Sequence, residues 1–399
     1  MDRKGGGRMV LKLLLHLLLL CLTHAQLLPL EMQALRDIRG SLQDMGGSSF
    51  FSSWDFSVDP CTSFSGLVCE SLHGLNRIVM LNLGSQSADS TGLTGVLHPS
   101  LGSLTFLKQL TVVPGTVTGT IPDSLGMLSE LQFLGISQNS ITGPIPDSFS
   151  YLKSLRVLNL SKNLLSGRIP SGLGNPPNLI AVVLSHNSLN GPIPSFTSPV
   201  IHLDLSQNAL SGWLPVLPAT LEYLSLTKNS LTGSLDPLSS LRNLNYVDLS
   251  FNQFIGSVPA NLFSLKMSAL LLQRNQLSGP ILPSSPVSIN KIDLSYNSFS
   301  GQLSPFLAHA HYLYLNNNNL NGIVPHEFVN SLLSANLQNL YLQHNFFTDI
   351  SLQSDMSLPT VSSLCIQYNC LVPPAQSACP WRTGKASSRP GYQCEGRHS

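Results

Sequence analysis

The sequence predicts an α/β solenoid: a right-handed, curved superhelix of about twelve repeats, with a parallel β-sheet on its concave side and extended or 3-10 segments on its convex side. The first observation is an asparagine that recurs ten times at intervals of 21 to 27 residues. The second is a pair of leucines, or similar apolar residues, at alternate positions before these asparagines. The ten are Asn139, Asn163, Asn187, Asn208, Asn229, Asn252, Asn275, Asn297, Asn318 and Asn345. A period of this length indicates stacked repeats.

Each fixed residue of the repeat has a physical role. In Leu158-Asn159-Leu160 the side chains alternate across a short strand, so the leucines point inward and Asn159 points outward. We expect the amide of the consensus Asn163 to bond backbone groups where the chain turns. Gly167 follows four residues later, where we expect a Cβ to obstruct the bend. Strands of successive repeats then bury a continuous leucine core.

The run LNLSKNLLSGRIP, residues 158–170, resembles the plant-type leucine-rich repeat of receptor-like proteins and receptor-kinase ectodomains. The resemblance covers roughly residues 30 to 380. It implies the leucine-rich repeat fold directly. It leaves the ligand open, because the repeat consensus describes the scaffold and not the variable outward positions.

Residues 1–25 predict a secretory signal peptide. Four basic side chains precede the apolar run from Leu13 to Leu22, and Thr23-His24-Ala25 ends on a small residue suited to cleavage. The apolar run of about ten residues is too short to cross about 30 Å of hydrocarbon. No later apolar run is long enough either, so we expect a secreted protein without a transmembrane span of its own.

Residues 26–75 predict an N-terminal cap. Apolar positions recur at three- and four-residue steps from Leu28 to Leu42, as in an amphipathic helix that Gly46-Gly47 would end. Trp54 and the pair Asp59-Pro60 follow. This order resembles the N-terminal cap of plant leucine-rich repeat proteins. A cap is needed because the first strand would otherwise expose its leucines and its backbone edge.

The remaining chain divides into leucine-rich repeats at 76–350, a cysteine-containing C-terminal cap at 351–382 and a flexible tail at 383–399. Six cysteines remain beyond the signal peptide, and an even number in an exported chain predicts disulfides. They are Cys61, Cys69, Cys365, Cys370, Cys379 and Cys394. Two precede the repeats and four follow, so we expect each end to be stapled separately, with the C-terminal pairing open. A zinc site is the alternative, but no matching histidine set accompanies the cysteines.

Composition and motifs argue against catalysis and nucleic-acid binding. Without residues 1–25 the chain keeps 17 Lys and Arg against 19 Asp and Glu, so no basic surplus attracts a polyanion. His326-Glu327 begins like a zinc-protease helix but lacks the second histidine, and His309-Ala310-His311 is a weak metal pair. No phosphate loop or nucleophile elbow is present. We therefore expect no enzymatic activity, no cofactor and no metal.

The outward strand positions are the candidate site. Aromatic and charged residues gather in the C-terminal half of the concave face, and exposed Tyr and Arg are enriched in binding hot spots. The candidates are Asp204, Tyr223, Tyr246, Asp248, Phe251, Arg274, Asp293, Tyr296, Tyr312, Tyr314 and Tyr341. The alternative is that aromatic residues simply favour strands. The sequon Asn159-Leu160-Ser161 lies on the same face, where a glycan would block contact locally.

These observations predict an extracellular scaffold that recognises a protein or peptide. The resemblance implies a receptor-like or co-receptor component of plant cell-surface signalling, which needs a membrane partner such as a receptor kinase. One alternative is an inhibitor of secreted cell-wall-degrading enzymes, similar to polygalacturonase-inhibiting proteins. Another is a structural component that binds cell-wall polysaccharide. All three place the protein in the extracellular space or cell wall, with the first held at the plasma membrane by its partners.

Overall fold

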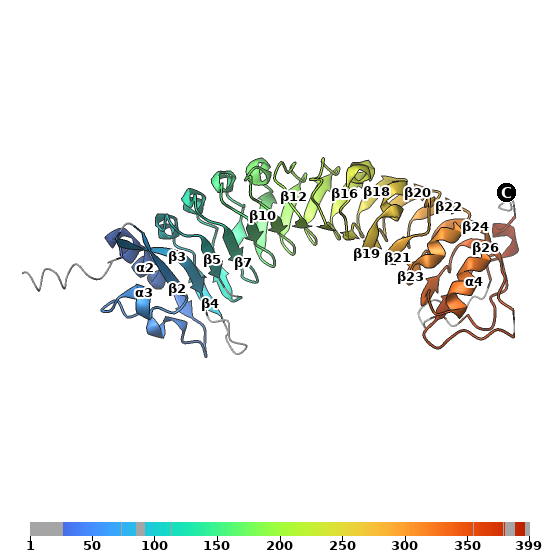
Figure 1. Ribbon diagram of the computed structural model, residues 1–399, viewed down its shortest axis with the longest axis horizontal. Coiled ribbons are helices and arrows are strands. Elements are labelled where there is room, and N and C mark those ends of the chain that lie inside the picture. The colour runs from blue at the N-terminus through green and yellow to red at the C-terminus, as the bar shows by residue number, and fades with distance from the viewer. Residues whose placement is uncertain are drawn as a thin grey trace, which may run out of the picture.

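The structure is a computed structural model that describes residues 27–72, 74–84, 92–112, 114–353, 355–377, 379 and 388–395. The expected signal peptide therefore lies outside the described residues. Repeats stack side by side into an arched solenoid, with helix α2 (Pro29–Ser41) at one end and helix α4 (His326–Leu333) near the other (Figure 1). No helix among the described residues has the length and apolar character needed to cross a membrane.

The inner side of the arch is a 14-stranded sheet, hereafter the concave sheet. Its first two strands are antiparallel and all later neighbours are parallel. The strands are β2 (Leu67–Leu72), β3 (Leu75–Leu83), β5 (Gln109–Val112), β7 (Phe133–Ile136), β9 (Val157–Asn159), β11 (Ala181–Val183), β13 (His202–Asp204), β15 (Tyr223–Ser225), β17 (Tyr246–Asp248), β19 (Lys266–Leu271), β21 (Ser288–Asp293), β23 (Tyr312–Tyr314), β25 (Asn339–Tyr341) and β27 (Ser363–Cys365). Leu158 and Leu160 are fully buried while Asn159 stays partly exposed, which confirms the predicted alternation.

A second, ten-stranded parallel sheet follows the turn of each repeat and is hereafter the outer sheet. Its strands are β8 (Thr142–Gly143), β10 (Leu164–Arg168), β12 (Ser188–Gly191), β14 (Ala209–Gly212), β16 (Ser230–Gly233), β18 (Gln253–Gly256), β20 (Gln276–Gly279), β22 (Ser298–Gly301), β24 (Asn319–Val324) and β26 (Phe346–Ile350). In Figure 1 its labels follow the convex side of the arch. The expected extended convex side is thus a hydrogen-bonded sheet.

Short 3-10 turns complete many repeats, as the predicted convex side requires. They are η2 (Pro99–Ser103), η3 (Asp123–Met127), η4 (Asp147–Tyr151), η5 (Ser171–Gly174), η6 (Asp236–Ser240), η7 (Ala260–Ser264) and η8 (Pro305–His309). Where the repeat step is longest, α4 replaces the 3-10 turn and buries Phe328 and Leu332. Leucines and occasional phenylalanines from both sheets and these turns fill one continuous core.

The consensus asparagines form a ladder. Asn163 Oδ1 accepts a hydrogen bond from the Ile141 backbone N–H at 3.0 Å, and its Nδ2 donates to the Leu160 carbonyl at 3.2 Å. This confirms the predicted role. The ladder also continues beyond residue 350, where the sequence had placed the end of the repeats. Asn369 accepts from the Phe347 N–H at 3.0 Å and donates to the Ile366 carbonyl at 2.8 Å, so β27 belongs to one further repeat.

A glycine stands four residues after nine of the ten consensus asparagines, and it is required for a reason that differs from the expected one. These glycines have φ values between +74° and +87°, which L-residues rarely adopt. At Gly256 an added Cβ would meet no atom within 4 Å. Backbone conformation, and not crowding alone, therefore selects glycine.

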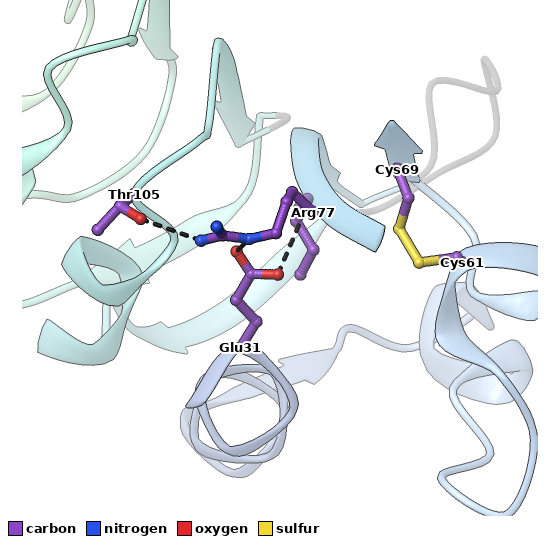
Figure 2. A network of polar contacts seen from close by, with 6 residues as sticks. Glu31, Cys61, Cys69, Arg77 and Thr105 are labelled. Carbon is purple, nitrogen blue, oxygen red and sulfur yellow. Dashed lines mark hydrogen bonds and ion pairs between the residues drawn. A yellow bond between two sulfur atoms is a disulfide. The ribbon is translucent and has the colours of Figure 1, made fainter. Parts of the chain in front are cut away.

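The N-terminal cap packs α2 against the first repeat. The helix ends at Ser41, before the expected stop at Gly46-Gly47, because β1 (Leu42–Asp44) begins there and pairs with β4 (Leu93–Val96). β6 (Thr116–Thr118) completes this three-stranded sheet. η1 (Phe50–Ser53) and α3 (Pro60–Ser63) follow, and a disulfide joins Cys61 to Cys69. Figure 2 shows this disulfide near the ion pair between Glu31 of α2 and Arg77 of β3.

The C-terminal cap contains two disulfides, Cys365–Cys379 and Cys370–Cys394, so each end of the chain is stapled separately as predicted. The expectation of a flexible tail does not hold for residues 388–395, which include η9 (Gly391–Gln393). The Arg389 guanidinium lies 4.0 Å from the centre of the Phe346 ring and donates to the Asn345 carbonyl at 3.0 Å. These contacts and the disulfide at Cys394 fix the segment to the end of the array.

Candidate functional site

The predicted recognition residues occupy three columns on the exposed face of the concave sheet. Parallel pairing in register aligns equivalent positions of successive repeats. The first column holds the first residue of each short strand, including Tyr223, Tyr246 and Tyr312. The second holds the residue two positions later, which is Asp204, Asp248, Asp293, Tyr314 or Tyr341. The third lies just beyond the strands and contains Phe251, Arg274 and Tyr296.

The first column contains a stack of three rings. The His202 and Tyr223 rings are 4.1 Å apart between centroids, and Tyr223 and Tyr246 are 4.7 Å apart, with interplanar angles of 5° in both pairs. Each inner ring face is thereby covered by a neighbour, and the ring edges and polar atoms are left to face a ligand. His202 was not among the predicted site residues. His202 stands two residues before Asp204, just as Tyr246 stands two residues before Asp248. This shared position in the repeat could have identified His202 as a site residue.

Partial burial sets the protonation of this stack. It lowers the pKa of His202, against the opposing effect of Asp204, so the imidazole is neutral at pH 7. Burial and then the charge of Asp248 raise the pKa of Tyr246 to about 12. The Tyr223 pKa is raised by the same kinds of cause, burial first. The stack therefore presents neutral hydrogen-bonding groups and no cation.

The aspartates of the second column are partly exposed and also have a structural role. Asp248 Oδ1 accepts hydrogen bonds from the Ser250 backbone N–H at 3.0 Å and from its hydroxyl at 2.6 Å. Asp293 makes the same pair of bonds with Ser295, and Asp204 makes them with Ser206. One carboxylate oxygen of each thus closes the turn after its strand, and the second oxygen remains for a ligand.

Burial raises the pKa of Asp248 and Asp293 despite these hydrogen bonds. The Lys291 ammonium, which lies in the first column on the same strand as Asp293, opposes the increase for both. The sequon residue Asn159 has the same geometry, because its Oδ1 accepts from the Ser161 N–H at 3.1 Å and hydroxyl at 2.7 Å. An amide can therefore replace the carboxylate at this position without loss of the turn.

The third column is built on left-handed backbone. Phe251, Arg274 and Tyr296 have φ values of 53°, 58° and 54°, a conformation that is strained for residues other than glycine. The Arg274 guanidinium lies between two rings, 5.4 Å from the Phe251 centroid and 4.1 Å from the Tyr296 centroid. Both rings are more than 40% exposed. Within the part of the chain that is described, Arg274 forms no ion pair, so its charge is held in place by aromatic faces alone.

The tyrosines nearest the C-terminal cap are also fixed. Tyr314 and Tyr341 meet edge to face at 5.1 Å, and Asn339 Nδ2 donates to the Tyr314 hydroxyl at 2.9 Å. The Tyr312 hydroxyl donates to Gln338 at 2.9 Å. Such contacts reduce the conformational entropy that ordered side chains lose when a ligand binds.

Metal-ligating groups do not gather on this face. Among the described residues there is no cluster of three or more His, Cys, Asp or Glu side chains that could hold a metal ion. Two hollows of about 560 and 570 Å³ share His309 and His311, but their linings contain no residue of the three columns. The three columns are accordingly separate from both hollows.

Sequence-family models match four parts of the chain. A leucine rich repeat N-terminal domain matches residues 28–70, and leucine rich repeats match 129–189, 219–262 and 309–331. The fold and the phase of the repeats agree with these matches.

Solved structures are similar over most of the chain. The plant peptide hormone receptor RGFR1 in complex with RGF2 is 29% identical over 73% of this chain and 48% of its own, with a TM-score of 0.64. The ectodomain of GASSHO1/SCHENGEN3 from Arabidopsis thaliana in complex with CASPARIAN STRIP INTEGRITY FACTOR 2 is 25% identical over 86% and 50%, with a TM-score of 0.50. A plant ice-binding protein is 25% identical over 90% and 99%, with a TM-score of 0.55. The chain thus spans about half the length of the two receptors.

Proposed function

The chain is a leucine-rich repeat protein of the plant type, and from this premise we propose that it is an extracellular scaffold that binds a peptide or protein on the C-terminal half of its concave sheet. The binding surface runs from β13 to β25 and comprises the three columns described above. The three disulfides of the chain suit an oxidising, extracellular location.

The observation that carries the proposal is the fixed arrangement of aromatic and charged side chains on this half of the sheet. The stack from His202 to Tyr246 and the guanidinium held between Phe251 and Tyr296 are ordered before any ligand arrives. Binding then costs little side-chain entropy. In the N-terminal half the same columns carry few aromatic or charged side chains: Gly135, Val157 and Ala181 are small or aliphatic, whereas Phe133 and Lys162 are not.

We infer further that a membrane protein binds the complex of this chain with its ligand. The similar structures include a plant peptide hormone receptor and the ectodomain of a plant membrane receptor kinase. A rigid scaffold of this kind transmits recognition by presenting the ligand to a second protein. The proposed role is therefore that of a receptor-like or co-receptor component held at the cell surface by its partner.

The alternative function is inhibition of secreted cell-wall-degrading enzymes. In that case the same surface would cover the active site of a hydrolase, and no signalling partner would be needed. An assay of polygalacturonase activity with and without the purified protein separates the two functions, because only an inhibitor reduces the rate of hydrolysis.

The test of the preferred function is affinity purification of the secreted, tagged protein from the cell surface, in parallel with a Tyr296→Ala/Tyr314→Ala variant. Lys162→Ala is a matched control, because Lys162 has the same left-handed conformation and exposed position in the N-terminal half. We expect a peptide or membrane receptor that the wild type and the control retain and the double variant loses. Equal recovery by all three proteins would remove this surface from consideration.

A further inference from the structure

The outer sheet is almost free of charge. Its ten strands contain two charged residues, Arg168 on β10 and Asp349 on β26, near opposite ends of the sheet. The strands between them, β12 to β24, contain none. The concave sheet carries ionisable side chains in most of its strands over the same repeats. An exposed sheet without charge is unfavourable for attracting polyanions or basic segments.

Hydroxyl and amide groups occupy the outward positions of this sheet instead. Around β14 they alternate with buried leucines on three adjacent strands and are exposed or half-buried. The group consists of Ser188, Asn190, Ser211, Ser230 and Thr232. None of these side chains forms a hydrogen bond with another described residue, so their donors and acceptors face solvent. Parallel pairing places them in rows about 4.8 Å apart.

Trp213 lies beside this group of hydroxyl and amide side chains, two repeats after Arg168, whose side chain lies over Gly191 of β12. Trp213 directly follows β14 and is 76% exposed. Its side chain leans over Gly233 at the end of β16, where an added Cβ would come within 2.8 Å of the indole Cδ1. The indole N–H has no partner among the residues that the structure describes. A large amphipathic ring with a free N–H on an open sheet is a binding element rather than a core residue.

We propose that the outer sheet around Trp213 binds a neutral, unbranched polysaccharide. A sugar ring has C–H groups on its faces and hydroxyls at its rim, so it matches an indole face surrounded by hydroxyl and amide side chains. The outer-sheet strands from β12 to β24 contain no charged residue, which favours a neutral glycan over an acidic glycan or a nucleic acid. The regular rows of polar groups suit a polymer that repeats its own hydroxyls along its length.

This site is independent of the proposed recognition surface. The two sheets are separate. In Figure 1 the labels β16, β18, β20 and β22 follow the convex side of the arch, and the labels β19, β21 and β23 follow the concave side. A protein that held wall polysaccharide on one sheet would keep its concave sheet open. The two activities should therefore fail separately when each is mutated.

The experiment measures retention of the purified full-length protein on microcrystalline cellulose and its affinity for soluble hydroxyethyl cellulose, with polygalacturonate as the acidic comparison. The variants are Trp213→Ala and Ser211→Arg, the second of which keeps the indole and places a long cation beside it. Tyr151→Ala is the matched control, because Tyr151 is 69% exposed at the end of η4 and lies outside both sheets. Tyr246→Ala tests independence from the concave sheet.

We expect both glucan probes to bind the wild type and both outer-sheet variants to lose about tenfold in affinity. Tyr151→Ala and Tyr246→Ala should bind as the wild type does. Tryptophan emission of the wild type should shift to shorter wavelength when hydroxyethyl cellulose binds, because Trp213 is exposed and Trp54 is buried. Trp213→Ala keeps Trp54 and Trp381 and should show no such shift. Circular dichroism checks that each variant is folded. If Trp213→Ala does not fold, Ser211→Arg alone tests the proposal.

Several results would overturn the proposal. They are unchanged glucan binding by both outer-sheet variants, stronger binding to polygalacturonate than to either glucan, and no glucan binding by the wild type. Inhibition of ice recrystallisation that is lost in Trp213→Ala, without glucan binding, would assign the hydroxyl rows to ice. A dimer that dissociates in the same variant would assign the face to a second copy of the chain.

Discussion

The guanidinium of Arg274 lies 4.1 Å from the centre of the Tyr296 ring, and the Phe251 ring approaches it from the preceding repeat. The three residues come from successive turns of the solenoid at the same left-handed position. A planar cation between two rings is oriented before binding, with its N–H groups available at the edge.

The first prediction concerns this cation. Arg274→Lys keeps the charge but loses the planar stack, so we expect it to weaken binding of the concave-face partner about tenfold, nearly as much as Arg274→Ala. Titration calorimetry with the recovered partner measures the change. Lys162→Ala should leave the affinity unchanged. Full affinity in Arg274→Lys would show that charge alone matters and that the aromatic sandwich does not.

The second prediction concerns Asp248, whose pKa is raised by burial. When a carboxyl group has a higher pKa in the folded state than in the unfolded state, its ionisation destabilises the folded protein. Its contribution to stability therefore falls as pH rises through the range between the unfolded-state and folded-state pKa. Asp248→Asn removes this cost and keeps the turn, as Asn159 does with Ser161. We expect an unchanged or slightly higher Tm at pH 7 and a flatter dependence of Tm on pH above the ordinary carboxyl pKa of about 4.

Thermal unfolding at several pH values checks this, with Asp248→Ala as the comparison that also loses both hydrogen bonds to Ser250. A Tm at pH 7 that is lower in Asp248→Asn than in Asp248→Ala would contradict the argument. If the proposed function is correct, Asp248→Asn should also bind a cationic ligand more weakly while remaining folded.

Periodicity explains why so much of the fold could be predicted. The leucine phase is repeated in every unit, so a single misread repeat changes little, and the asparagine ladder follows from the same phase. The last repeat escaped prediction because the next asparagine, Asn369, lies among the C-terminal cysteines and its strand begins after an irregular stretch. Its hydrogen bonds identify it only once the neighbouring backbone is placed.

Other features depend on contacts that sequence spacing does not encode. The polar tail composition gave no sign that Arg389 would lie against Phe346 and Tyr368, more than twenty residues earlier. The columns of the concave face could be assigned from phase, but the ring stack from His202 to Tyr246 depends on side-chain rotamers. Trp213 follows a consensus glycine like any other residue, and its exposure follows from the side chain's position over Gly233.

The third prediction tests the ladder at Asn252. This buried side chain accepts from the Leu231 N–H at 3.0 Å and donates to the Leu226 and Leu249 carbonyls at 2.9 and 3.1 Å. Asn252→Ala removes the acceptor of the Leu231 N–H and one of the two donors to each carbonyl, which keep Asn229 and Asn275. We therefore expect a loss of about 2 kcal/mol in the free energy of unfolding. Gln253→Ala, at the exposed neighbour, should change it by less than about 0.5 kcal/mol. Urea unfolding distinguishes the two, and equal effects would refute a structural ladder.

The fourth prediction concerns the N-terminal cap. Glu31 is fully buried on α2, and its carboxylate accepts from Arg77 Nε at 3.0 Å, while Arg77 also donates to Thr105 at 3.2 Å (Figure 2). Burial raises the pKa of Glu31 although the Arg77 guanidinium opposes it. Removal of one member leaves the other charge buried without its partner.

Glu31→Ala should therefore lower the free energy of unfolding by about 3 kcal/mol. Because repeat arrays unfold from their ends, amide exchange should increase first in α2 and β3 and leave β15 to β19 protected. Gln33→Ala, on the exposed side of the same helix, is the control and should show wild-type exchange. Uniformly faster exchange along the whole array would mean that the cap and the repeats unfold as one unit, and that the ion pair does more than hold the cap in place.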